Sequence, residues 1–369
     1  MKKTTILYIV STLGRTGPTR QLLYLISRLD RSLFDPHVVT LSLEPADSLK
    51  PKFIKIGIKL HSLELSRFTG LFLALFRLKR FLKLLKPDII HSQGLRADWL
   101  SSQLNNTIRI ATQRNNPFSD YPSLMGQIPG WLAAHLHYRA LRRLQVVACS
   151  ESISQVNQRF ALIDTIIRNG VDTTAFSPLV QSAITKYQRL ELNLPVDGQL
   201  FIYTGPVINR KNIPYLIRTF AKKTSHNDYL VILGTGPLLE HLRKIAGDKP
   251  NIIFRGGVDN VPQYLQVADW LVSASLDEGL PNSVLEALAT GVPALLSDIP
   301  PHREILALSP DSGELFDVND PDSLCNLICM LARSADMRKN ARALATNHFS
   351  CESMSARYQA LYHQQLKAR

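Results

Sequence analysis

The sequence has few cysteines and no long apolar run, and both shortages limit what the protein can be. Four cysteines occur in 369 residues, and no two of them form a Cys-x-x-Cys pair. They are Cys149, Cys325, Cys329 and Cys351. This scatter favours small apolar core residues over a metal or redox site, and it suits a reducing compartment. No stretch approaches the ~18 consecutive apolar residues of a membrane-spanning helix.

Acidic residues are scarce in the first half of the chain. Residues 1–180 hold 24 Lys and Arg against 11 Asp and Glu, whereas residues 181–369 hold 19 of each. The net charge of +13 therefore belongs entirely to the first half. This asymmetry predicts an anionic partner for one domain only: nucleic acid, an anionic bilayer surface or a phosphate-bearing lipid. The basic amphipathic stretch 71–86 is a candidate for bilayer contact, although plain packing explains its pattern too.

Apolar segments alternate with amphipathic ones, which predicts βαβ units and parallel sheets in two domains. In the first half, strands are expected at 6–10, 37–43, 89–92 and 145–150, with helices at 20–29, 71–86 and 131–144. The apolar run 6–10 is too short for a signal peptide and is interpreted as the first strand. A polar stretch at 177–198 suits a linker and a lead-in helix.

A second alternation begins at residue 200. Its expected strands are 200–204, 229–234, 252–255, 270–273 and 294–297. Its expected helices are 213–223, 238–246, 261–268, 283–289 and 323–333, followed by a final helix at 352–367. Because ligands of parallel sheets bind beyond the carboxyl ends of the strands, functional residues are expected just after strands.

The most informative segment, residues 276–288, follows a predicted strand and opens a helix. Asn282 or Ser283 can cap that helix, and the amides of its first turn suit a diphosphate. Glu278 and Glu286 lie on either side of the helix start. A carboxylate beside a diphosphate is repelled unless it binds hydroxyls, and a ribose offers two vicinal ones. Two charges that merely favour a helix N-terminus would give the same pattern.

This segment resembles the E-x7-E signature of the group-1, retaining GT-B glycosyltransferases, family four of the sequence-based classification. The likeness extends through residues 280–283 and 289–293. It implies that Glu286 binds the donor ribose and that Glu278 contacts the transferred sugar. The surrounding donor-binding residues would be Gly279, Leu280, Asn282 and Ser283. The resemblance also implies a nucleotide-diphosphate sugar as substrate, with UDP the expected nucleotide, and neither cofactor nor metal.

Residues 203–212 resemble the family's loop that carries a basic pair for the diphosphate. Lys211 aligns with the usual Lys, but Pro206 occupies the usual Arg position, and Arg210 is the neighbouring cation that can replace it. A cation is needed because the departing diphosphate gains negative charge in the transition state. Glu278, Lys211 and Arg210 are therefore the expected catalytic residues. The resemblance adds further donor-binding positions at Gly205, Gly234, Gly236 and Val258.

The first half carries looser matches to the same family. Gly17 lies in a loop resembling one that approaches the donor phosphate, although Thr16 replaces a usual glycine. His91 ends a predicted strand, where a cleft position is favoured over a purely structural one. Arg114 stands near the place where many relatives have a His, and Arg cannot act as a base near neutral pH. His91, Arg114 and Asn115 are the expected acceptor-side residues.

One further motif points to a different chemistry. Asp320-Pro321-Asp322 fits the D-x-D pattern of metal-dependent transferases. Its place before a helix, with Pro near the first turn, is better interpreted as capping.

Together these patterns predict an α/β GT-B fold of two Rossmann-like, doubly wound parallel-sheet domains that face each other across a cleft. We expect an acceptor-side domain at 1–180 with a returning helix at 349–369, and a nucleotide-sugar domain at 190–348. The expected activity is metal-independent sugar transfer, with retention, to a saccharide or lipid-linked saccharide acceptor in surface polysaccharide, O-antigen or capsule synthesis. Such an enzyme would be cytoplasmic, with peripheral contact to the anionic inner face of the membrane.

Two other functions fit the same fold. A sugar-nucleotide epimerase would act on the nucleotide sugar without an acceptor. A non-catalytic nucleotide or polysaccharide binder would accommodate the departures at Pro206 and Arg114. A nucleic-acid binder is disfavoured because no recognised module or interleaved aromatic–basic motif occurs.

Overall fold

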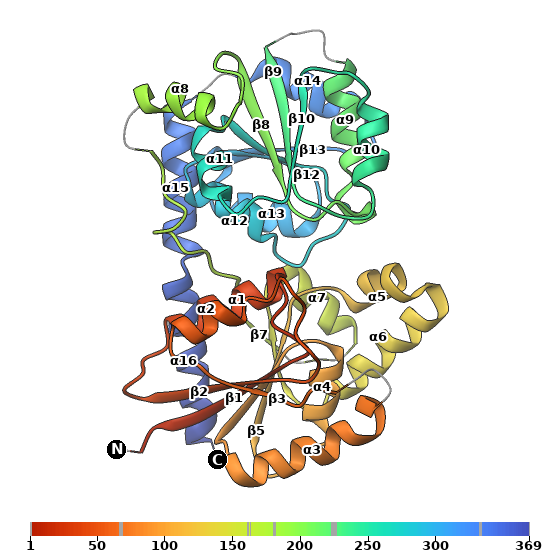
Figure 1. Cartoon of the computed structure of the whole chain (residues 1–369), viewed down its shortest axis with the longest axis vertical. Coiled ribbons are helices and arrows are strands. Elements are labelled where there is room, and N and C mark those ends of the chain that lie inside the picture. Colours follow the sequence, from red (N-terminus) through yellow and green to blue (C-terminus); the bar gives the residue numbers. More distant parts are fainter. Residues whose placement is uncertain are drawn as a thin grey trace. The chain divides into compact units, whose positions relative to one another are not determined.

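The computed structural model describes residues 2–65, 69–160, 162, 164–179, 182–222, 227–331 and 334–368. The chain divides into two compact units. The first comprises Met1–Gly170 and Cys351–Arg369, and the second is Val171–Ser350. Each unit is built around one parallel sheet with helices packed on it (Figure 1).

The first unit contains a seven-stranded sheet in the order β3-β2-β1-β4-β5-β6-β7, in which all neighbouring strands are parallel. Its strands are β1 Thr4–Val10, β2 Phe34–Thr40, β3 Lys59–Ser62, β4 Ile89–Ser92, β5 Ile108–Gln113, β6 Gln145–Ala148 and β7 Asp164–Ile166. Its helices are α1 Gly17–Ser27, α2 Lys50–Lys55, α3 Thr69–Leu85, α4 Leu95–Ser102, α5 Pro117–Met125, α6 Gln127–Leu141, α7 Glu151–Arg159 and α16 Cys351–Lys367. Apolar strand residues such as Ile6 and Ile89 are fully buried.

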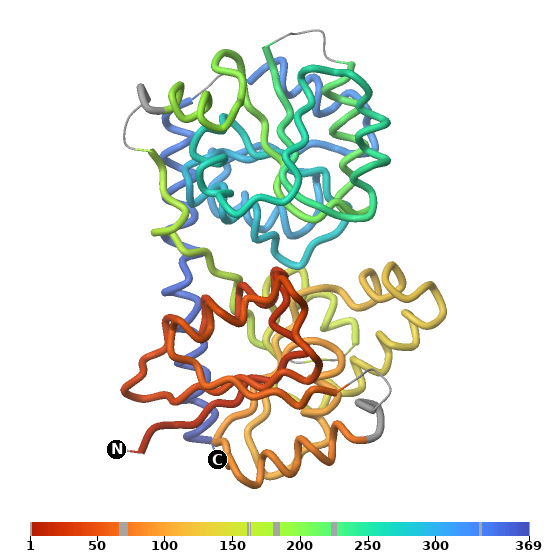
Figure 2. The backbone as a smooth tube through the Cα atoms, viewed as in Figure 1, coloured from red at the N-terminus to blue at the C-terminus, as the bar shows by residue number. Residues whose placement is uncertain are grey.

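The last helix, α16, returns to the first unit although it is farthest from it in sequence. Tyr358 and Tyr362 of this helix are buried in the same core cluster as Tyr8 and Phe34. The hydroxyls of Tyr8 and Tyr362 lie 3.1 Å apart. Figure 2 shows the helix, in blue, beside the red and orange strands of this unit. The C-terminal helix therefore completes the core of the first unit, as the sequence predicted.

The second unit contains a six-stranded sheet in the order β10-β9-β8-β11-β12-β13, again with parallel neighbours. Its strands are β8 Gln199–Thr204, β9 Asp228–Leu233, β10 Ile252–Gly256, β11 Trp270–Ser273, β12 Ala294–Ser297 and β13 Gly313–Phe316. Its helices are α8 Ser182–Glu191, α9 Ile213–Lys222, α10 Leu239–Ala246, α11 Val261–Val267, α12 Asn282–Ala289, α13 Pro300–Ala307, α14 Ser323–Met330 and α15 Ala335–His348, with 3-10 turns η1 Asn209–Lys211 and η2 Pro310–Ser312.

Both strand orders are doubly wound, and this topology decides where a ligand can bind. The direction of strand addition reverses between β1 and β4 in the first sheet and between β8 and β11 in the second. The loops that leave two such strands diverge to opposite faces and open a crevice at the carboxyl edge. The loops after β8 and β11 carry the basic pair and the first Glu of the predicted donor site.

The long apolar strands and amphipathic helices lie where the sequence predicted them. The strands that the prediction omitted are β3, β5, β7 and β13. Two of them, β3 and β7, are edge strands of three or four residues without fully buried side chains, so they lack a distinct apolar pattern. The predicted helices 213–223 and 323–333 begin as expected, but residue 223 and residues 332–333 lie outside the described part of the chain.

In the residues that the structure describes, no helix combines the length and the apolar character that crossing a bilayer requires.

Candidate functional site

The centre of the candidate donor site is a cluster of three charged side chains in the second unit. Arg210 and Lys211 lie on η1, directly after β8, whereas Glu278 lies in the loop between β11 and α12. The amide of Leu276 donates a 2.8 Å hydrogen bond to the carbonyl of Arg210, which ties the two loops together. The switch point thus brings together residues that are far apart in sequence.

Both cations of this cluster bind the same carboxylate. Arg210 Nη1 donates to Glu278 Oε2 at 2.9 Å, and Lys211 Nζ pairs with Glu278 Oε1. Burial alone would raise the pKa of Glu278, but the charges of Lys211 and Arg210 outweigh it and lower the pKa to about 2. Glu278 is therefore ionised at neutral pH and can accept hydrogen bonds but cannot donate a proton. These three side chains together carry one net positive charge.

The helix that follows Glu278 begins differently from the prediction. The sequence predicted a cap from Asn282 or Ser283, but the N-cap residue is Pro281, which makes no side-chain cap hydrogen bond. Asn282 and Ser283 are instead the first helical residues and are half-buried. Glu286 lies one turn further along, with 3% of its surface exposed. The prediction that a side chain caps this helix is therefore wrong, because Pro281 has no oxygen on its side chain.

Two glycine-containing loops pack backbone to backbone beside the charged cluster. Gly205, Gly234 and Gly236 follow β8 and β9. The Gly205 amide donates to Leu233, and the Val207 amide donates to Thr235. A Cβ atom added at Gly234 would lie 1.8 Å from the Gly205 carbonyl oxygen, and Gly234 also has a φ of +148°. These glycines are therefore required by the close approach of two strand-end loops.

The remaining donor-side residues lie at the same carboxyl edge. Gly279 and Leu280 are buried in the loop before α12, and Val258 is half-buried after β10. Pro206, at the position where the resemblance predicted an Arg, accepts a 2.8 Å hydrogen bond from the Tyr203 hydroxyl through its carbonyl. This loop is thus held by Tyr203, and Arg210 is the residue that brings a second cation to Glu278.

Sequence reasoning missed a buried histidine near this cluster. His302 lies on α13, beyond the end of β12, and is fully buried. Its Nδ1 lies 2.8 Å from the Ser297 carbonyl, so this nitrogen carries the proton. Burial lowers the pKa of His302 to about 4, and the charge of Glu278 opposes that shift. Within the described residues its Nε2 has no hydrogen-bond partner. Its position in sequence just after a predicted strand is the one feature that could have marked His302 as a candidate site residue.

The sequence predicted a cleft position on the acceptor side for His91 of the first unit. This residue does end β4, but it is fully buried. Its Nδ1 lies 2.7 Å from the Tyr362 hydroxyl, and its Nε2 lies 2.7 Å from the Thr112 hydroxyl. Burial and the nearby charge of Arg114 lower the pKa of His91 to about 3. Because both ring nitrogens are hydrogen-bonded to Tyr362 and Thr112, His91 holds these two side chains in place. It has no free nitrogen to offer an acceptor in this conformation.

Arg114 is positioned by side chains from two other segments of the first unit. Its Nε donates to Gln93 Oε1 at 3.1 Å, and its Nη1 binds Asn169 Oδ1. In the described part of the chain, Arg114 Nη2 and Gln93 Nε2 are buried without hydrogen-bond partners. Asn115 instead pairs with Asp120 on α5. Two unsatisfied donors at the ends of β4 and β5 suit a ligand that offers hydroxyl or anionic oxygens.

The loop that contains Gly17 is exposed at the start of α1. Thr16, in place of a glycine, is the N-cap of this helix, and its hydroxyl accepts from the Thr19 amide at 3.4 Å. The Glu44 carboxylate holds the preceding turn by accepting from the Leu13 amide at 2.9 Å. The Thr16 departure therefore has a local structural reason, since a threonine caps a helix well.

The features that the sequence discounted are not assembled into a metal site. No group of three His, Cys, Asp or Glu side chains in the described residues is placed to hold a metal ion. Asp322 is the N-cap residue of α14 but makes no side-chain cap bond, so the capping prediction is correct in position only. The Asp320 carboxylate accepts from the Asp322 amide at 2.9 Å. None of the four cysteines forms a disulfide, and Cys329 is exposed.

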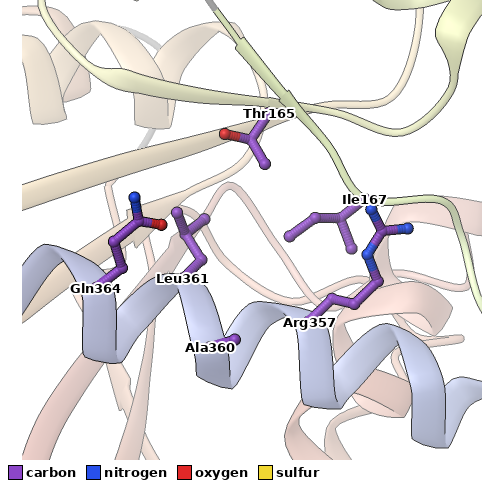
Figure 3. Close-up of a pocket in the computed structure, with 6 residues that line it drawn as sticks. All are labelled: Thr165, Ile167, Arg357, Ala360, Leu361 and Gln364. Carbon is purple, nitrogen blue, oxygen red and sulfur yellow. The ribbon is translucent and has the colours of Figure 1, made fainter.

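One hollow of about 200 Å³ lies in the first unit, away from all of these residues. It is bounded by the edge strand β7 and by α16 (Figure 3), with Thr165 and Ile167 facing the helix. Arg357 on α16 donates to the Ile166 carbonyl at 3.0 Å. The rest of its lining is Ala360, Leu361 and Gln364. No pair of acid and base groups lines it, so it is a packing groove between an edge strand and a helix.

Comparison with solved structures identifies the fold. The chain superposes on sucrose-phosphate synthase from Thermosynechococcus elongatus with a TM-score of 0.83, 19% identity and full coverage of both chains. It matches HepE from Anabaena, solved with UDP and glucose, with a TM-score of 0.83, 14% identity and coverage of 98% and 100%. At this level of identity the likeness defines the fold, which is GT-B.

Comparison with sequence families identifies the enzyme class. Residues 198–334 match the model described as Glycosyl transferases group 1, and residues 15–175 match the Glycosyltransferase Family 4 model. The chain therefore belongs to the group-1, family-4 glycosyltransferases, enzymes that transfer sugars. This confirms the family inferred from the E-x7-E segment.

Two Escherichia coli relatives show the range of similarity. One is the UDP-Gal:alpha-D-GlcNAc-diphosphoundecaprenol alpha-1,3-galactosyltransferase, 31% identical over 54% of this chain and 53% of that protein. The other is the O-antigen biosynthesis glycosyltransferase WclY, 26% identical over 77% of this chain and 80% of that protein. The chain thus spans about half the length of the first relative and four-fifths of the second.

Proposed function

We propose that this glycosyltransferase moves a sugar from a UDP-sugar to a lipid-linked saccharide, with retention of anomeric configuration and without a metal ion, during synthesis of a bacterial surface polysaccharide. The nucleotide sugar would bind the second unit, and the first unit would receive the acceptor. The names of the two Escherichia coli relatives support the acceptor and the pathway. Bound UDP in HepE supports the nucleotide.

The observation that carries this proposal is the cluster of Lys211, Arg210 and Glu278 at the strand-order switch of the second sheet. When the bond from the anomeric carbon to the diphosphate breaks, negative charge grows on the diphosphate oxygens. Two cations held at the carboxyl edge stabilise that charge without reorganising. Such preorganised electrostatic stabilisation is usually the largest single contribution to catalysis. The start of α12 adds amide dipoles of the same sign.

The carboxylates take the roles of hydroxyl acceptors. Glu278 stays ionised because its pKa is about 2, so it can accept hydrogen bonds from the transferred sugar and hold Lys211 and Arg210 in place beside the diphosphate. Glu286, nearly buried on α12, would accept from the ribose hydroxyls. The acceptor hydroxyl must lose its proton to a base. Glu278, with a pKa of about 2, is too weak a base, and Arg114 cannot accept a proton. The leaving diphosphate itself then takes the acceptor proton, which is consistent with retention.

The charge of the first unit supports an acceptor carried by an anionic membrane. Residues 1–170 and 351–369 hold 27 Lys and Arg against 11 Asp and Glu, whereas the second unit holds 16 against 19. A diphosphate-linked lipid in an anionic bilayer is attracted to such a surface. We place the enzyme at the cytoplasmic face of that membrane, where nucleotide sugars are made.

A binding panel followed by a transfer assay tests the proposal. UDP, GDP, ADP and their sugars are compared by thermal shift, since a ligand at about 100 times its dissociation constant adds ~2.7 kcal/mol of stability. The matching sugar nucleotide is then supplied with diphosphoundecaprenyl saccharides, with and without EDTA. We expect UDP to stabilise the protein and transfer to survive EDTA, with the donor's anomeric configuration kept in the NMR spectrum of the product.

Each part of the proposal has its own contrary result. An inverted product contradicts retention, and loss of transfer in EDTA contradicts metal independence. An epimerised nucleotide sugar formed without acceptor identifies an epimerase instead. Stabilisation by UDP without turnover of any acceptor would favour a nucleotide-binding protein.

A further inference from the structure

Helix α6 of the first unit is apolar on two opposite faces. Its inward face consists of Gly130, Ala134, His137, Tyr138 and Leu141, all buried. Its outward face carries Ile128, Trp131, Leu132 and Leu136, which are 76%, 53%, 51% and 57% exposed. These four positions recur at the helical spacing of three and four residues, so they form one continuous stripe. A helix that is apolar all round is normally covered on every side, yet here half of it faces solvent.

The preceding helix extends this surface. Leu124 and Met125, at the end of α5, are 76% and 46% exposed. Helices α5 and α6 pack against each other as a hairpin at the edge of the first unit (Figure 1). We name the six side chains of this hairpin the apolar hairpin face: Leu124, Met125, Ile128, Trp131, Leu132 and Leu136.

The hairpin is held rigidly, so the exposure of this face does not come from a loosely attached segment. A Cβ atom at Gly130 would lie 2.3 Å from the Pro122 nitrogen, which shows how closely α6 crosses α5. His137 on α6 then links two other helices. Its Nδ1 lies 2.7 Å from the Tyr121 hydroxyl of α5, and its Nε2 lies 2.9 Å from the Asp98 carboxylate of α4.

Arginines continue the same stripe toward the end of α6. Arg139 follows Leu136 on the outward face, and Arg142 and Arg143 come one turn later; all three are exposed. No Asp or Glu occurs from residue 121 to residue 150. Among the described residues, no carboxylate forms an ion pair with these three arginines. The surface is therefore an apolar patch with a purely cationic border.

We propose that the apolar hairpin face is the surface on which this protein docks to an anionic lipid bilayer. Trp and Leu side chains enter the boundary between headgroups and acyl chains, and the neighbouring arginines bind lipid phosphates. A second copy of the chain is a poorer occupant, because a two-fold contact through this face would bring two sets of uncompensated arginines together. The inference deepens the proposed function by naming where the membrane-borne acceptor is met.

This surface differs from the one that the sequence suggested. Helix α3, within the predicted stretch 71–86, exposes Phe76 and Leu84 at 66% and 81%. The exposed residues around them are mainly basic, among them Arg77, Lys79, Arg80 and Lys83. It can add electrostatic attraction to the bilayer. From residue 73 onward, however, basic residues separate the exposed apolar side chains of Leu73 (41% exposed) and Phe76 from that of Leu84, and the helix contains no tryptophan.

Vesicle flotation of the full chain tests the proposal. Vesicles of phosphatidylcholine alone are compared with vesicles that also contain phosphatidylglycerol. The triple variant Ile128→Ser, Trp131→Ser, Leu136→Ser is expected to bind the anionic vesicles at least about tenfold more weakly. The matched control replaces three exposed apolar residues of the second unit, Tyr187→Ser, Leu190→Ser and Met330→Ser, and is expected to bind like the parent.

A second variant examines the cationic border. Arg139→Gln, Arg142→Gln, Arg143→Gln is expected to lose binding to anionic vesicles and to flatten its dependence on salt. Trp99→Phe leaves Trp131 and the buried Trp270 as emitters, so the emission of Trp131 is the difference between this variant and Trp99→Phe, Trp131→Phe. It should shift to shorter wavelength on vesicle binding, which reports entry of this side chain into the boundary region.

Three results would overturn the proposal. One is equal vesicle binding by the parent and the apolar triple variant, provided that both unfold at the same temperature. The second is Trp131 emission that vesicles leave unchanged. The third is a parent dimer, seen by light scattering, that the triple variant dissociates. UDP stabilisation and transfer to a water-soluble acceptor should be the same in all variants, so failure of membrane docking is distinguishable from failure of the proposed activity.

Discussion

Lys211 and Glu278 form a buried ion pair although 67 residues separate them in sequence. Each residue has only 8% of its surface exposed, and Arg210 binds the second carboxylate oxygen. Burying charges is costly unless they are paired, so the two strand-end loops must keep this geometry in the folded state. The pair therefore joins the stability of the second unit to its proposed chemistry.

Replacing Lys211 with Ala should lower kcat/KM for sugar transfer by about 10² to 10³, because one of two preorganised cations at the leaving diphosphate is lost. Lys222→Ala is the matched control, since Lys222 is an exposed lysine of the same unit that pairs at 3.6 Å with Asp322. Its kinetics should equal those of the parent. Steady-state kinetics with varied sugar nucleotide and a fixed acceptor concentration measures this loss. If Lys211→Ala has the same kcat/KM as the parent, Lys211 does not belong to the donor site.

The pKa of Glu278 predicts how its contribution to stability depends on pH. The folded-state pKa is about 2, below the ordinary value of 4.5, so the ionised form is favoured by folding. This contribution is complete above pH ~4.5 and is lost as the pH falls toward 2; the full shift corresponds to stabilisation on the order of 3 kcal/mol. The free-energy advantage of the parent over Glu278→Gln in urea titrations should shrink over that window. A constant difference between pH 5 and pH 3 would contradict it.

Buried His91 predicts acid sensitivity of the first unit. Its pKa falls from 6.5 to about 3 on folding, so folding favours the neutral ring. That stability is complete above pH ~6.5 and is lost as the pH drops toward 3, because the unfolded chain binds a proton that the folded chain excludes. The stability of the parent relative to His91→Gln should therefore decrease from pH 7 to pH 4. Urea unfolding at each pH measures it, with His363→Gln on α16 as the control. A parent-minus-variant difference that stays flat with pH would mean that His91 titrates normally.

Gly234 should tolerate no side chain. Ala at this position would place Cβ 1.8 Å from the Gly205 carbonyl oxygen at a φ of +148°, which should cost about 3 kcal/mol and weaken UDP binding. Gly57→Ala separates clash from backbone strain, since Gly57 has a φ of +72° with open space around it. That variant should lose about 1 kcal/mol and bind UDP normally. Thermal unfolding with and without UDP measures both, and equal effects would show that the loop approach is not what requires Gly234.

Much of the fold followed from local patterns. Largely apolar runs such as residues 200–204 and 270–273 predicted buried parallel strands, and both are strands in the structure. The segment from Glu278 to Glu286 also predicted a strand end followed by a helix. Short edge strands such as β7 were missed, because half-buried residues at a sheet edge carry no distinct periodicity.

The site was less predictable, because burial and pairing depend on contacts between distant segments. The sequence placed His91 at a strand end, but it could not show that Tyr362 would cover it. Likewise, the sequence showed only that Arg210 is a cation next to Lys211. The structure showed that both residues bind the carboxylate of Glu278. The buried His302 lies in no recognised pattern, and only packing shows that it lies near the charged cluster.

The sequence by itself determined the family, the alternation of strands and helices, and the excess positive charge of the first half, because these depend on residue type and spacing along the chain. The tertiary structure alone decided which charged side chains form ion pairs, which histidines are buried away from solvent, and which face of α6 remains exposed to solvent. These outcomes depend on how closely distant segments approach one another, and the free energies of ion pairing, burial and exposure arise only from that proximity.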